Sequence, residues 1–505
     1  MSIVITWVFI FLGLLYNKNG DWMKKLSDLI NCDIDVLVND IKVNSKDVLP
    51  GDAFICVDFN TKDRHEFIDD AISRGASCII ARKQVPQKSV PVLVVDNPNK
   101  ILNEICSKLY DNPEKKLTMI GVTGTDGKTS VSTIIQTLLG NENCGYIGTN
   151  GYNCAAFNRD APNTTPSGDK LFRYFHEFLE SGCSYCSMEV SSEGLMRGRV
   201  DKIDYDISIL TNITSEHLNI HGDLQSYVHA KCELFRKTKK DGYSILNIDD
   251  KHFEEVMKAC NGHILTYGSK SNADLYFYDI KLFPTKTNFK FKYLNKEYSV
   301  ETPFPGLFNV YNLSAAMLAL FALGYDFDYI KKRIPLIKVS GRLEMIDLGQ
   351  DFHVMVDYAH TPNGITKLLE YVKLLPINRS IVVIGQAGER DPYKRKEVGE
   401  IVARNCDYAI FTYEDPRSED PRDIIDMMTQ NIRDLDNYEV IIDRKEAIKR
   451  AIELAQPNDM VMVLGKGNET YEKLKDKVIY FNDIEEVKKD LKERLEVHSW
   501  NLAFT

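Results

Sequence analysis

The stretch Gly121-Val-Thr-Gly-Thr-Asp-Gly-Lys-Thr-Ser130 decides the fold. The apolar run 117–123 predicts a buried strand that leads into it, and the run 131–139 predicts the helix that follows. Gly124 and Gly127 allow the backbone to bend around phosphate groups, and the start of the helix adds N–H donors and a positive dipole. The segment is therefore typical of a nucleotide-binding loop between a strand and a helix.

Two side chains of this loop point to chemistry on a nucleotide. We expect Lys128 to reach the outer phosphates and Thr129 to bind Mg²⁺. The general pattern G-x-x-x-x-G-K-[ST] is missed by one residue, because Val122 stands where its first glycine belongs. The alternative is a glycine turn that only joins a strand to a helix.

Length and composition limit the classes of protein to consider. The chain has 505 residues, 44% of them hydrophobic and 27% charged, which is ordinary for globular proteins of about three domains. Its 63 Lys and Arg against 73 Asp and Glu give a net charge of −10, which argues against a nucleic-acid partner. Eleven cysteines without a paired pattern predict buried thiols in a reducing compartment, the cytoplasm, and Cys183-Ser-Tyr-Cys186 alone is weak evidence for a metal site.

Three α/β domains are predicted along the chain, at 23–110, 111–338 and 339–505. Short strands and helices alternate in the first, a polar stretch at 110–116 is typical of a linker, and the continuous apolar strands of the other two favour parallel sheets. Residues 3–16 are an uncharged, mostly apolar stretch of about 14 residues, short of the roughly 20 that a spanning helix needs, so we interpret residues 1–22 as a mis-assigned start or a marginal appendage. Membrane contact is expected only if residues 3–16 are a real anchor.

Several motifs in a fixed order make the chain resemble the Mur ligase family, over nearly all of it after residue 22. The family carries the loop variant Thr123-Gly-Thr-Asp-Gly-Lys-Thr, and further matching blocks are Asn163-Thr-Thr-Pro, Met188-Glu-Val-Ser-Ser, Thr211-Asn-Ile-Thr, His229-Ala-Lys, Gly341-Arg-Leu-Glu, Asp357-Tyr-Ala-His and Gly465-Lys-Gly-Asn-Glu. The match is closest to the branch that adds the third residue of the peptidoglycan stem peptide. It implies a small UDP-substrate domain, a central ATPase with a parallel sheet and a Rossmann-like C-terminal domain.

The resemblance also implies a reaction and its cofactors. A diamino acid would be joined to UDP-N-acetylmuramoyl-L-alanyl-D-glutamate through an acyl phosphate, at the expense of ATP, with two Mg²⁺ ions and with CO₂ for a carbamylated lysine. A monomer is expected. The residues implied to be catalytic are Lys128, Glu189, His217 and carbamylated Lys231, and the metal ligands are Thr129, Glu189, His217 and Lys231.

Three further groups of residues are implied by position in the family motifs. Those implied for ATP are Gly124, Thr125, Asp126, Gly127, Lys128, Thr129, Ser130, Asn309 and Asn312 on a loop entering a helix, Arg342, Asp357 and His360. Those implied for the UDP substrate are Ser45, Thr164, Thr165, Ser191, Arg197 and Arg199. Those implied for the amino acid are Arg390, Asp415, Arg417, Gly465 and Glu469.

The identity of the amino acid is the open question. Arg417 favours meso-diaminopimelate, because a guanidinium pairs with a second carboxylate and repels the ammonium of lysine. Asp415 stands where the family has asparagine and could equally welcome a free ammonium, so L-lysine remains the alternative. Further departures are Asn44 for aspartate, Glu193 for histidine, Glu216 and Asn219 for aspartates, and Asn468 for histidine.

Two other functions compete with this interpretation. One is a related amide ligase with a different substrate, such as a folate polyglutamate enzyme. The other is a non-catalytic nucleotide-binding scaffold, which would have no need for two metal sites.

Overall fold

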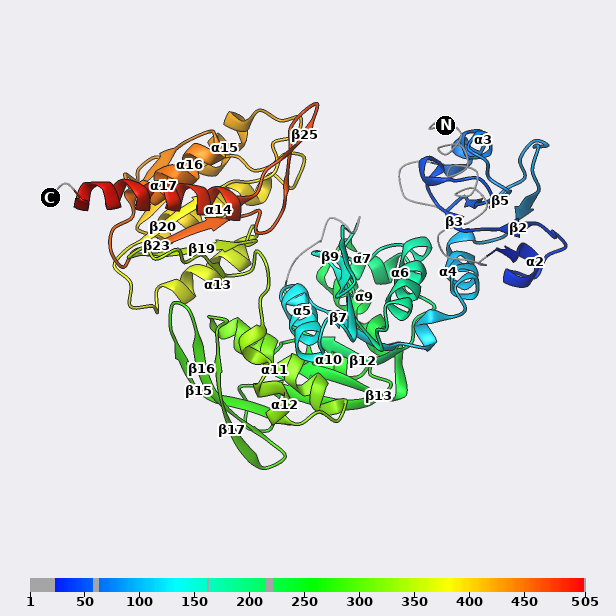
Figure 1. Cartoon of the computed structure of the whole chain (residues 1–505), viewed down its shortest axis with the longest axis horizontal. Coiled ribbons are helices and arrows are strands. Elements are labelled where there is room, and N and C mark those ends of the chain that lie inside the picture. The colour runs from blue at the N-terminus through cyan, green and yellow to red at the C-terminus, as the bar shows by residue number, and fades with distance from the viewer. Residues whose placement is uncertain (1–22, 58–62, 161–162, 215–220, 504–505) are drawn as a thin grey trace, which may run out of the picture.

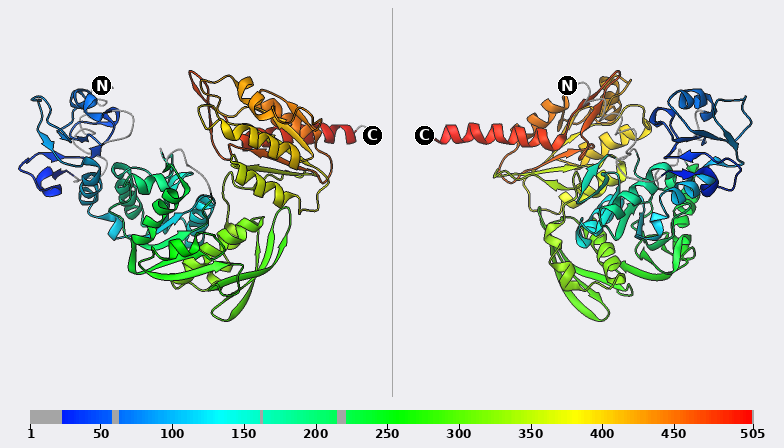
Figure 2. Two further views of the ribbon diagram at one scale, coloured as in Figure 1. Left: turned by 180° about the vertical axis from the view of Figure 1, so that it is seen from behind. Right: turned by 45° about the vertical axis from the view of Figure 1, so that its right-hand side comes forward.

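The computed structural model describes residues 23–57, 63–160, 163–214 and 221–503. Three sheets with their helices form three units that follow one another along the chain (Figure 1). The N-terminal and C-terminal units stand on either side of the central one, as the views in Figure 2 also show. The expected features of residues 1–22 lie outside the described residues.

The N-terminal unit is a small parallel sheet with short helices. The sheet order is β3-β4-β5-β6, and Ile79, Ile80 and Ala81 of its third strand are fully buried, as expected of a strand covered on both faces. The strands are β3 (Ile41–Lys42), β4 (Ala53–Ile55), β5 (Cys78–Ala81) and β6 (Val92–Val94), with the separate pair β1 (Lys24–Lys25) and β2 (Leu37–Val38). The helices are α2 (Leu26–Leu29), α3 (Ile68–Ser73), α4 (Pro98–Leu109) and the 3₁₀ turns η1 (Ser45–Asp47) and η2 (Arg64–Phe67).

The central unit is one sheet of eleven described strands, in the order β10-β9-β8-β11-β7-β12-β13-β14-β15-β16-β17. Its seven middle strands are parallel, but β9, β10, β16 and β17 run antiparallel to their neighbours, so the expectation of a parallel sheet holds only for the middle. The bounds are β7 (Thr118–Thr123), β8 (Cys144–Gly148), β9 (Gly151–Cys154), β10 (Phe157–Arg159), β11 (Tyr185–Glu189), β12 (Tyr205–Leu210), β13 (Thr238–Asn247), β14 (His263–Gly268), β15 (Leu275–Leu282), β16 (Thr287–Tyr293) and β17 (Lys296–Thr302).

The antiparallel edge has a local cause. In β16, the buried Phe289 and Phe291 alternate with Lys290 and Lys292, which are less buried, so this strand buries only one face. A tight turn through Leu294 and Asn295, both with positive φ, joins it to β17.

Helices cover both faces of the central sheet. The face with Ile120 and Val122 packs against α5 and α11, and the face with Met119 and Met188 packs against α6 and α9. The hydrophobic core on the face with Met119 and Met188 continues into the N-terminal unit through Leu102 of α4. The helices are α5 (Lys128–Leu139), α6 (Gly168–Glu180), α7 (Ser192–Met196), α9 (Leu224–Arg236), α10 (Phe253–Met257), α11 (Leu307–Ala322), α12 (Phe327–Lys331) and the 3₁₀ turn η4 (Ile334–Leu336).

The C-terminal unit is a sheet in the order β18-β19-β23-β20-β21-β22, parallel except at β18. The strands are β18 (Glu344–Met345), β19 (His353–Asp357), β20 (Ser380–Ile384), β21 (Tyr408–Phe411), β22 (Tyr438–Val440) and β23 (Met460–Leu464), with the hairpin β24 (Tyr471–Lys473) and β25 (Val478–Tyr480). The helices are α13 (Pro362–Val372), α14 (Tyr393–Asn405), α15 (Pro421–Thr429), α16 (Arg444–Leu454) and α17 (Asp483–Ala503). The last helix, α17, packs on the sheet through Val487 and Leu491, which are buried.

The polar stretch 110–116 is packed rather than open. It contains the 3₁₀ turn η3 (Pro113–Lys115), and the buried carboxylate of Glu114 accepts a hydrogen bond from Ser107 Oγ at 2.8 Å. The polar composition predicted a linker here. In the structure, the hydrogen bond between Ser107 of α4 and Glu114 of η3 fixes this segment against the end of α4.

Two global expectations concern the membrane and the cysteines. Within the described residues, no helix has both the length and the apolar character needed to cross a bilayer. All eleven cysteines belong to the described part and are free, and Cys183 and Cys186 are buried as predicted.

Candidate active site

Three neighbouring strands of the central sheet bring the predicted residues to one edge. β7 lies between β11 and β12, and all three are parallel, so their carboxyl ends meet. Glu189 at the end of β11 is in register with Val122, and Leu210 at the end of β12 is in register with Thr123. Ligands of open parallel sheets bind outside such carboxyl ends.

The loop between β7 and α5 has the shape of a phosphate cradle. Gly127 has φ +84° and a Cβ there would lie 2.5 Å from Asn312 Oδ1, so a side chain would be both strained and crowded. Lys128 Nζ donates hydrogen bonds to the carbonyl oxygens of Gly124 at 3.0 Å and Thr125 at 2.8 Å. The lysine thus folds back across the loop, where it is placed to contact bound phosphates.

The segment after β12 holds this loop in place. Thr125 N–H donates to Asn212 O at 2.7 Å, and Thr125 Oγ1 lies 3.2 Å from Tyr227 Oη. Thr129 and Ser130 are buried in the first turn of α5. The backbone of the loop is therefore held in place by the protein's own hydrogen bonds.

Glu189 is fully buried and held by three donors. Its Oε1 accepts from Tyr146 Oη at 2.7 Å and from Thr149 N–H at 2.8 Å, and its Oε2 accepts from Thr149 Oγ1 at 3.3 Å. Burial first, and the nearby Glu189 carboxylate next, raise the pKa of Tyr146 well above its usual value, so the phenol stays a donor. A fixed carboxylate at this edge is a hard oxygen ligand of the kind that Mg²⁺ prefers.

Lys231 reaches the same loop from α9. Only 1% of its surface is exposed, Nζ donates to Gly124 O at 2.7 Å, and it lies 4.3 Å from the centre of the Tyr227 ring. Among the described residues no three His, Cys, Asp or Glu side chains converge as a metal site. The expected ligand His217 lies outside the described residues, as do the departures Glu216 and Asn219.

Asn309 and Asn312 lie within the first two turns of α11 rather than on a loop before it. Asn309 Nδ2 donates to Pro305 O at 2.7 Å, and Asn312 Nδ2 donates to Asn309 Oδ1 at 2.9 Å. The proximity of Asn312 Oδ1 to Gly127 places this helix start against the phosphate loop. The helix starts earlier than the sequence analysis expected, directly after Gly306, which has φ +97°.

The C-terminal unit contributes a short segment around β19. Asp357 is buried, and its two carboxylate oxygens accept from Leu343 N–H and Ala359 N–H, each at 2.7 Å. Burial raises the pKa of Asp357, and the charge of Arg342 opposes that shift. Arg342 lies over the ring of Tyr358 at 4.7 Å, and His360 Nδ1 is 2.8 Å from Tyr358 O.

Four residues predicted for the UDP substrate gather beside Glu189. Thr165 Oγ1 donates to Glu189 O at 2.9 Å and accepts from Ser191 N–H, and Arg199 Nη1 donates to Thr165 O at 2.9 Å. Thr164 Oγ1 lies 3.2 Å from Thr149 Oγ1. These hydroxyls and the guanidinium thus form one hydrogen-bonded group beside Glu189.

Glu193, in place of the family's histidine, pairs with two arginines. Its Oε1 lies 2.8 Å from Arg197 Nε and 3.4 Å from Arg199 Nη2. This departure therefore partly neutralises the arginines predicted to bind an anionic substrate.

Ser45 lies apart from these residues, in the N-terminal unit, where it is buried. Between this unit and the central one lies a cavity of about 790 Å³ to which Arg197 contributes. Four basic and three acidic side chains line it, together with asparagines; the charged ones are Arg82, Lys100, Arg197, Lys202, Asp96, Glu104 and Asp201.

In the C-terminal unit, the loops after β20, β21 and β23 form a second polar centre. Lys466 Nζ donates to Asp415 Oδ1 at 2.8 Å and to Glu469 Oε2 at 3.1 Å, and Asp415 Oδ1 also accepts from Lys473 N–H at 3.1 Å. The ammonium of Lys466 is fully buried. Asp415 is thus already paired with an internal cation.

The remaining amino-acid residues differ in exposure. Arg417 is half-buried, has φ +54°, and its Nε is a buried atom without a hydrogen-bond partner within the described residues. Arg390 is exposed on the neighbouring loop. Glu389 and Asp415 also have positive φ. Such strained non-glycine backbone clusters at functional sites.

Glu414 is a further buried acid at this centre. Burial raises its pKa to about 7, which Arg444 and Lys466 oppose and Glu469 and Asp415 reinforce. Its Oε2 is 2.3 Å from where a Cβ on Gly465 would lie. Gly465 is therefore needed for space at this point.

Sequence reasoning missed the residues that hold the predicted ones. Tyr146 orients Glu189, Tyr227 lies under Lys231, and Lys466 neutralises Asp415. The lysine was visible in the block Gly465-Lys-Gly-Asn-Glu, but its partner is 51 residues away in sequence. No pattern in the sequence predicted a role for Tyr146 or Tyr227.

A glycine loop from a parallel strand to a helix, with a lysine folded across it and a fixed carboxylate on the next strand, is the arrangement of a nucleotide-binding protein of the P-loop type. Comparison with family models places the Mur ligase middle domain at residues 122–320 and the Mur ligase glutamate ligase domain at 341–467.

Individual relatives agree with the family models. The chain is 35% identical over 477 residues, 94% of this chain and 98% of the relative, to the UDP-N-acetylmuramoyl-L-alanyl-D-glutamate–2,6-diaminopimelate ligase of Caldanaerobacter subterraneus subsp. tengcongensis. It is 37% identical over 464 residues, 90% of this chain and 95% of the relative, to the enzyme of that name from Geobacillus thermodenitrificans. A solved structure of a ligase of that name matches with a TM-score of 0.66 at 28% identity, covering 94% of this chain and 99% of its own. The chain belongs to the Mur ligase family and is an ATP-dependent acid–amino-acid ligase.

Proposed function

We propose that this chain adds meso-diaminopimelate to UDP-N-acetylmuramoyl-L-alanyl-D-glutamate in peptidoglycan synthesis. The observation that carries the choice of amino acid is the pairing of Asp415 with Lys466, beside an Arg417 that has an unsatisfied donor. The names of the relatives support it, since they are 2,6-diaminopimelate ligases.

The reaction joins a carboxylate to an amine, and the carboxylate must first be activated. Its oxygen attacks the γ-phosphorus of ATP, the bond to the β,γ-bridging oxygen breaks, and ADP leaves. The amine nitrogen then attacks the carbonyl carbon of the acyl phosphate, inorganic phosphate leaves and the nitrogen loses a proton. Lys128 and the N–H groups of the loop stabilise the phosphoryl charge that is transferred.

The donors at the carboxyl edge fit Mg²⁺. Thr129 and Glu189 offer a hydroxyl and a carboxylate, and Mg²⁺ sites beside phosphates commonly take one or two such protein ligands. Bound Mg²⁺ would neutralise charge between the anions. We further propose that Lys231 is carbamylated by CO₂, which turns its amine into a carboxylate ligand at this loop, and that His217 adds a nitrogen ligand to a second ion.

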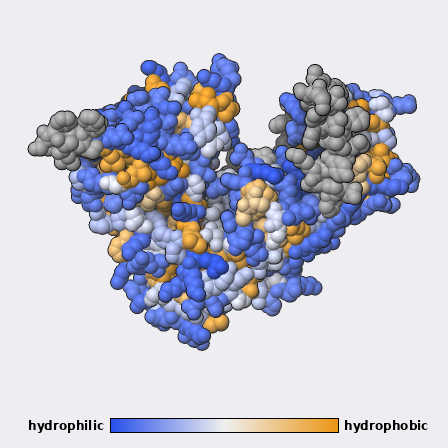
Figure 3. All heavy atoms as spheres, viewed as in Figure 1, coloured by the Kyte–Doolittle hydropathy of each residue, from blue (hydrophilic) through white to orange (hydrophobic). Residues whose placement is uncertain are grey.

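For the UDP substrate, we propose Thr164, Thr165, Ser191 and Arg199 at the sugar and diphosphate, and Ser45 at the uridine. Arg197, at the edge of the neighbouring cavity, offers a guanidinium to an anionic ligand. Binding of such an anion breaks the ion pairs that Glu193 makes with Arg197 and Arg199, and this loss reduces the net free energy of binding. Figure 3 shows the molecular face hollowed above the central unit, between the other two.

For the amino acid, we propose that Arg417 binds the distal carboxylate, Arg390 the α-carboxylate, and Glu469 and Gly465 the amino group. Asn309, Asn312, Arg342, Asp357 and His360 would contact the adenosine and phosphates of ATP. We also propose domain limits at 23–110, 111–338 and 339–505, a cytoplasmic location and a monomer.

One assay tests the function. Purified protein receives the UDP-dipeptide, ATP and Mg²⁺, and phosphate release and peptide formation are measured with and without meso-diaminopimelate. We expect phosphate release only when both co-substrates are present. Nucleotide binding without phosphate release under any of these conditions would favour a scaffold and contradict the proposal.

A further inference from the structure

One face of α13 docks on the central unit. Asn363, Lys367 and Tyr371 are spaced by four residues, so they lie on the same side of the helix. Each has a partner in the central unit, although the helix belongs to the C-terminal one. We call these three residues the docking face of α13.

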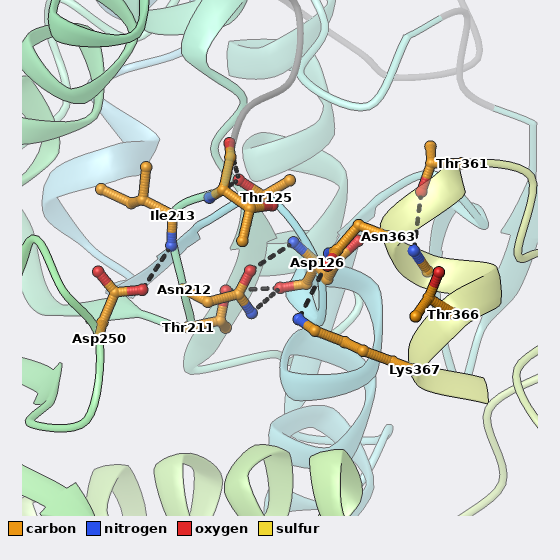
Figure 4. A network of polar contacts seen from close by, with 12 residues as sticks. Thr125, Asp126, Thr211, Asn212, Ile213, Asp250, Thr361, Asn363, Thr366 and Lys367 are labelled. Atoms are coloured by element: carbon orange, nitrogen blue, oxygen red, sulfur yellow. Dashed lines mark hydrogen bonds and ion pairs between the residues drawn. The ribbon is translucent and has the colours of Figure 1, made fainter. Parts of the chain in front are cut away.

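At the start of this face the partner is Asp126 in the phosphate loop (Figure 4). Its Oδ2 accepts from Asn363 Nδ2 at 3.2 Å and lies 3.9 Å from Lys367 Nζ. The carboxylate also lies near the N-terminal end of the helix, where the dipole attracts negative charge.

Asp126 is itself fixed to the central sheet. Its N–H donates to Asn212 Oδ1 at 3.1 Å, and its carbonyl oxygen accepts from Thr211 Oγ1 at 2.6 Å and from Asn212 Nδ2 at 3.1 Å. The backbone at Asp126 is therefore fixed, and Figure 4 shows the carboxylate projecting from it toward α13.

At the other end of the face, Tyr371 packs against the central unit. It is 4% exposed, its Oη donates to Phe283 O at 2.9 Å, and its ring meets that of Phe308 edge-on at 6.3 Å. The contacts of Asn363 and Lys367 with Asp126, and the aromatic contact of Tyr371, together fix the direction of the helix.

We propose that Asn363, Lys367 and Tyr371 are positioning residues that hold the C-terminal unit over the phosphate loop, and that the pairing of Lys367 with Asp126 couples this orientation to nucleotide binding. The proposal rests on the ATP site proposed above. α13 starts directly after Asp357 and His360, so a rotation of the helix moves both groups relative to the loop. Without the pairing, their contacts to ATP would have to be formed from a broader range of orientations.

The size of the effect follows from exposure. The side chains of Lys367 and Asp126 are 43% and 41% exposed, so solvent and salt screen their attraction. Exposed pairs are worth about 0.2–1 kcal/mol, which corresponds to a change in ATP affinity of up to about fivefold. A contact this weak can break and form again in each catalytic cycle.

A double-mutant cycle tests the coupling. The dissociation constant for Mg-ATP is measured by calorimetry for the native chain, Lys367→Met, Asp126→Asn and the double variant. We expect Lys367→Met to weaken binding about 1.4-fold to fivefold in the native background and to have no effect once Asp126 is asparagine. An equal loss in both backgrounds, or no loss in either, would overturn the proposal.

Two further measurements separate positioning from general stability. Lys373→Met, at the end of the same helix and in contact with Asn405 rather than the loop, should leave ATP affinity unchanged. Hydrogen exchange of 359–367 should speed up in Lys367→Met and not in Lys373→Met; equal exchange in the two would also overturn the proposal. These readouts need no amino acid, so a chain that binds ATP but forms no peptide would contradict the proposed function and leave this inference standing.

Discussion

Lys466 donates a hydrogen bond to the carboxylate of Asp415, with 2.8 Å between Nζ and Oδ1. The aspartate replaces an asparagine of the family pattern, and from the sequence it could attract the ammonium of a lysine substrate. Because a buried cation already neutralises it, that attraction is weak. The charge of Asp415 is thus paired inside the protein, and the proposed choice between the two amino acids rests on Arg417.

Replacement of Arg417 should therefore change the preference for the amino acid. Arg417→Ala should lower kcat/KM for meso-diaminopimelate relative to L-lysine by the equivalent of about 2–4 kcal/mol, because the distal carboxylate loses its half-buried partner. Rates of peptide formation with each amino acid measure this directly. The exposed Arg422 provides the control, since Arg422→Ala should change neither. Equal losses on both amino acids would remove Arg417 from the selectivity.

Replacement of Lys231 tests the proposal that this lysine is carbamylated. Lys231→Ala should abolish activity, and acetate or formate in solution should restore part of it, because a small carboxylate can fill the space and serve as a ligand. Lys237→Ala, at the end of the same helix and paired with Asp201, should remain active. Full activity of Lys231→Ala, or failure of every small carboxylate to rescue it, would argue against carbamylation.

Glu414 should make stability depend on pH. Burial raises its pKa to about 7 in the folded chain from the ordinary 4.5 of a glutamate, so between these values the folded state holds a proton that the unfolded state has lost. The contribution is complete below pH 4.5 and is lost as the pH rises through 7. Thermal unfolding midpoints from pH 5 to pH 8 should fall less steeply for Glu414→Gln than for the native chain.

The control for this pH dependence is Glu485→Gln, which changes an exposed glutamate that accepts from Tyr480 Oη. Its midpoints should follow those of the native chain at every pH. Identical pH profiles for Glu414→Gln and the native chain would show that Glu414 keeps its ordinary pKa.

Gly465 and Gly349 form a matched pair for testing the space beside Glu414. Both have positive φ, +114° and +96°, but a Cβ on Gly465 would lie 2.3 Å from Glu414 Oε2, whereas nothing lies within 4 Å of one on Gly349. Gly465→Ala should destabilise the fold by about 1–3 kcal/mol more than Gly349→Ala does, because only it adds a clash to the backbone strain. Chemical unfolding measures both, and equal costs would mean that Glu414 moves aside freely.

The sequence alone was enough for the phosphate loop and the middle of the sheet. The run 117–123 is buried on both faces in β7, and the run 131–139 lies in α5, because both patterns are local. The antiparallel edge could also have been predicted, since Phe289 and Phe291 alternate with lysines. We did not predict it, because we expected parallel strands throughout the sheet.

Contacts between distant segments could not be predicted. Tyr146 and Glu189 are 43 residues apart, and Asp126 and Asn363 are 237 residues apart. No periodicity or motif records such pairs, because they depend on how strands are ordered and how units dock. Glu189 itself could be placed at a strand end, but not the three donors that fix it.

The most direct test of the central claim is the choice of amino acid in peptide-bond formation. With the UDP-dipeptide, ATP and Mg²⁺, the purified chain should form the tripeptide faster with meso-diaminopimelate than with L-lysine, with one ADP released per peptide bond. A product formed preferentially with L-lysine, or no peptide bond with either amine, would contradict the account.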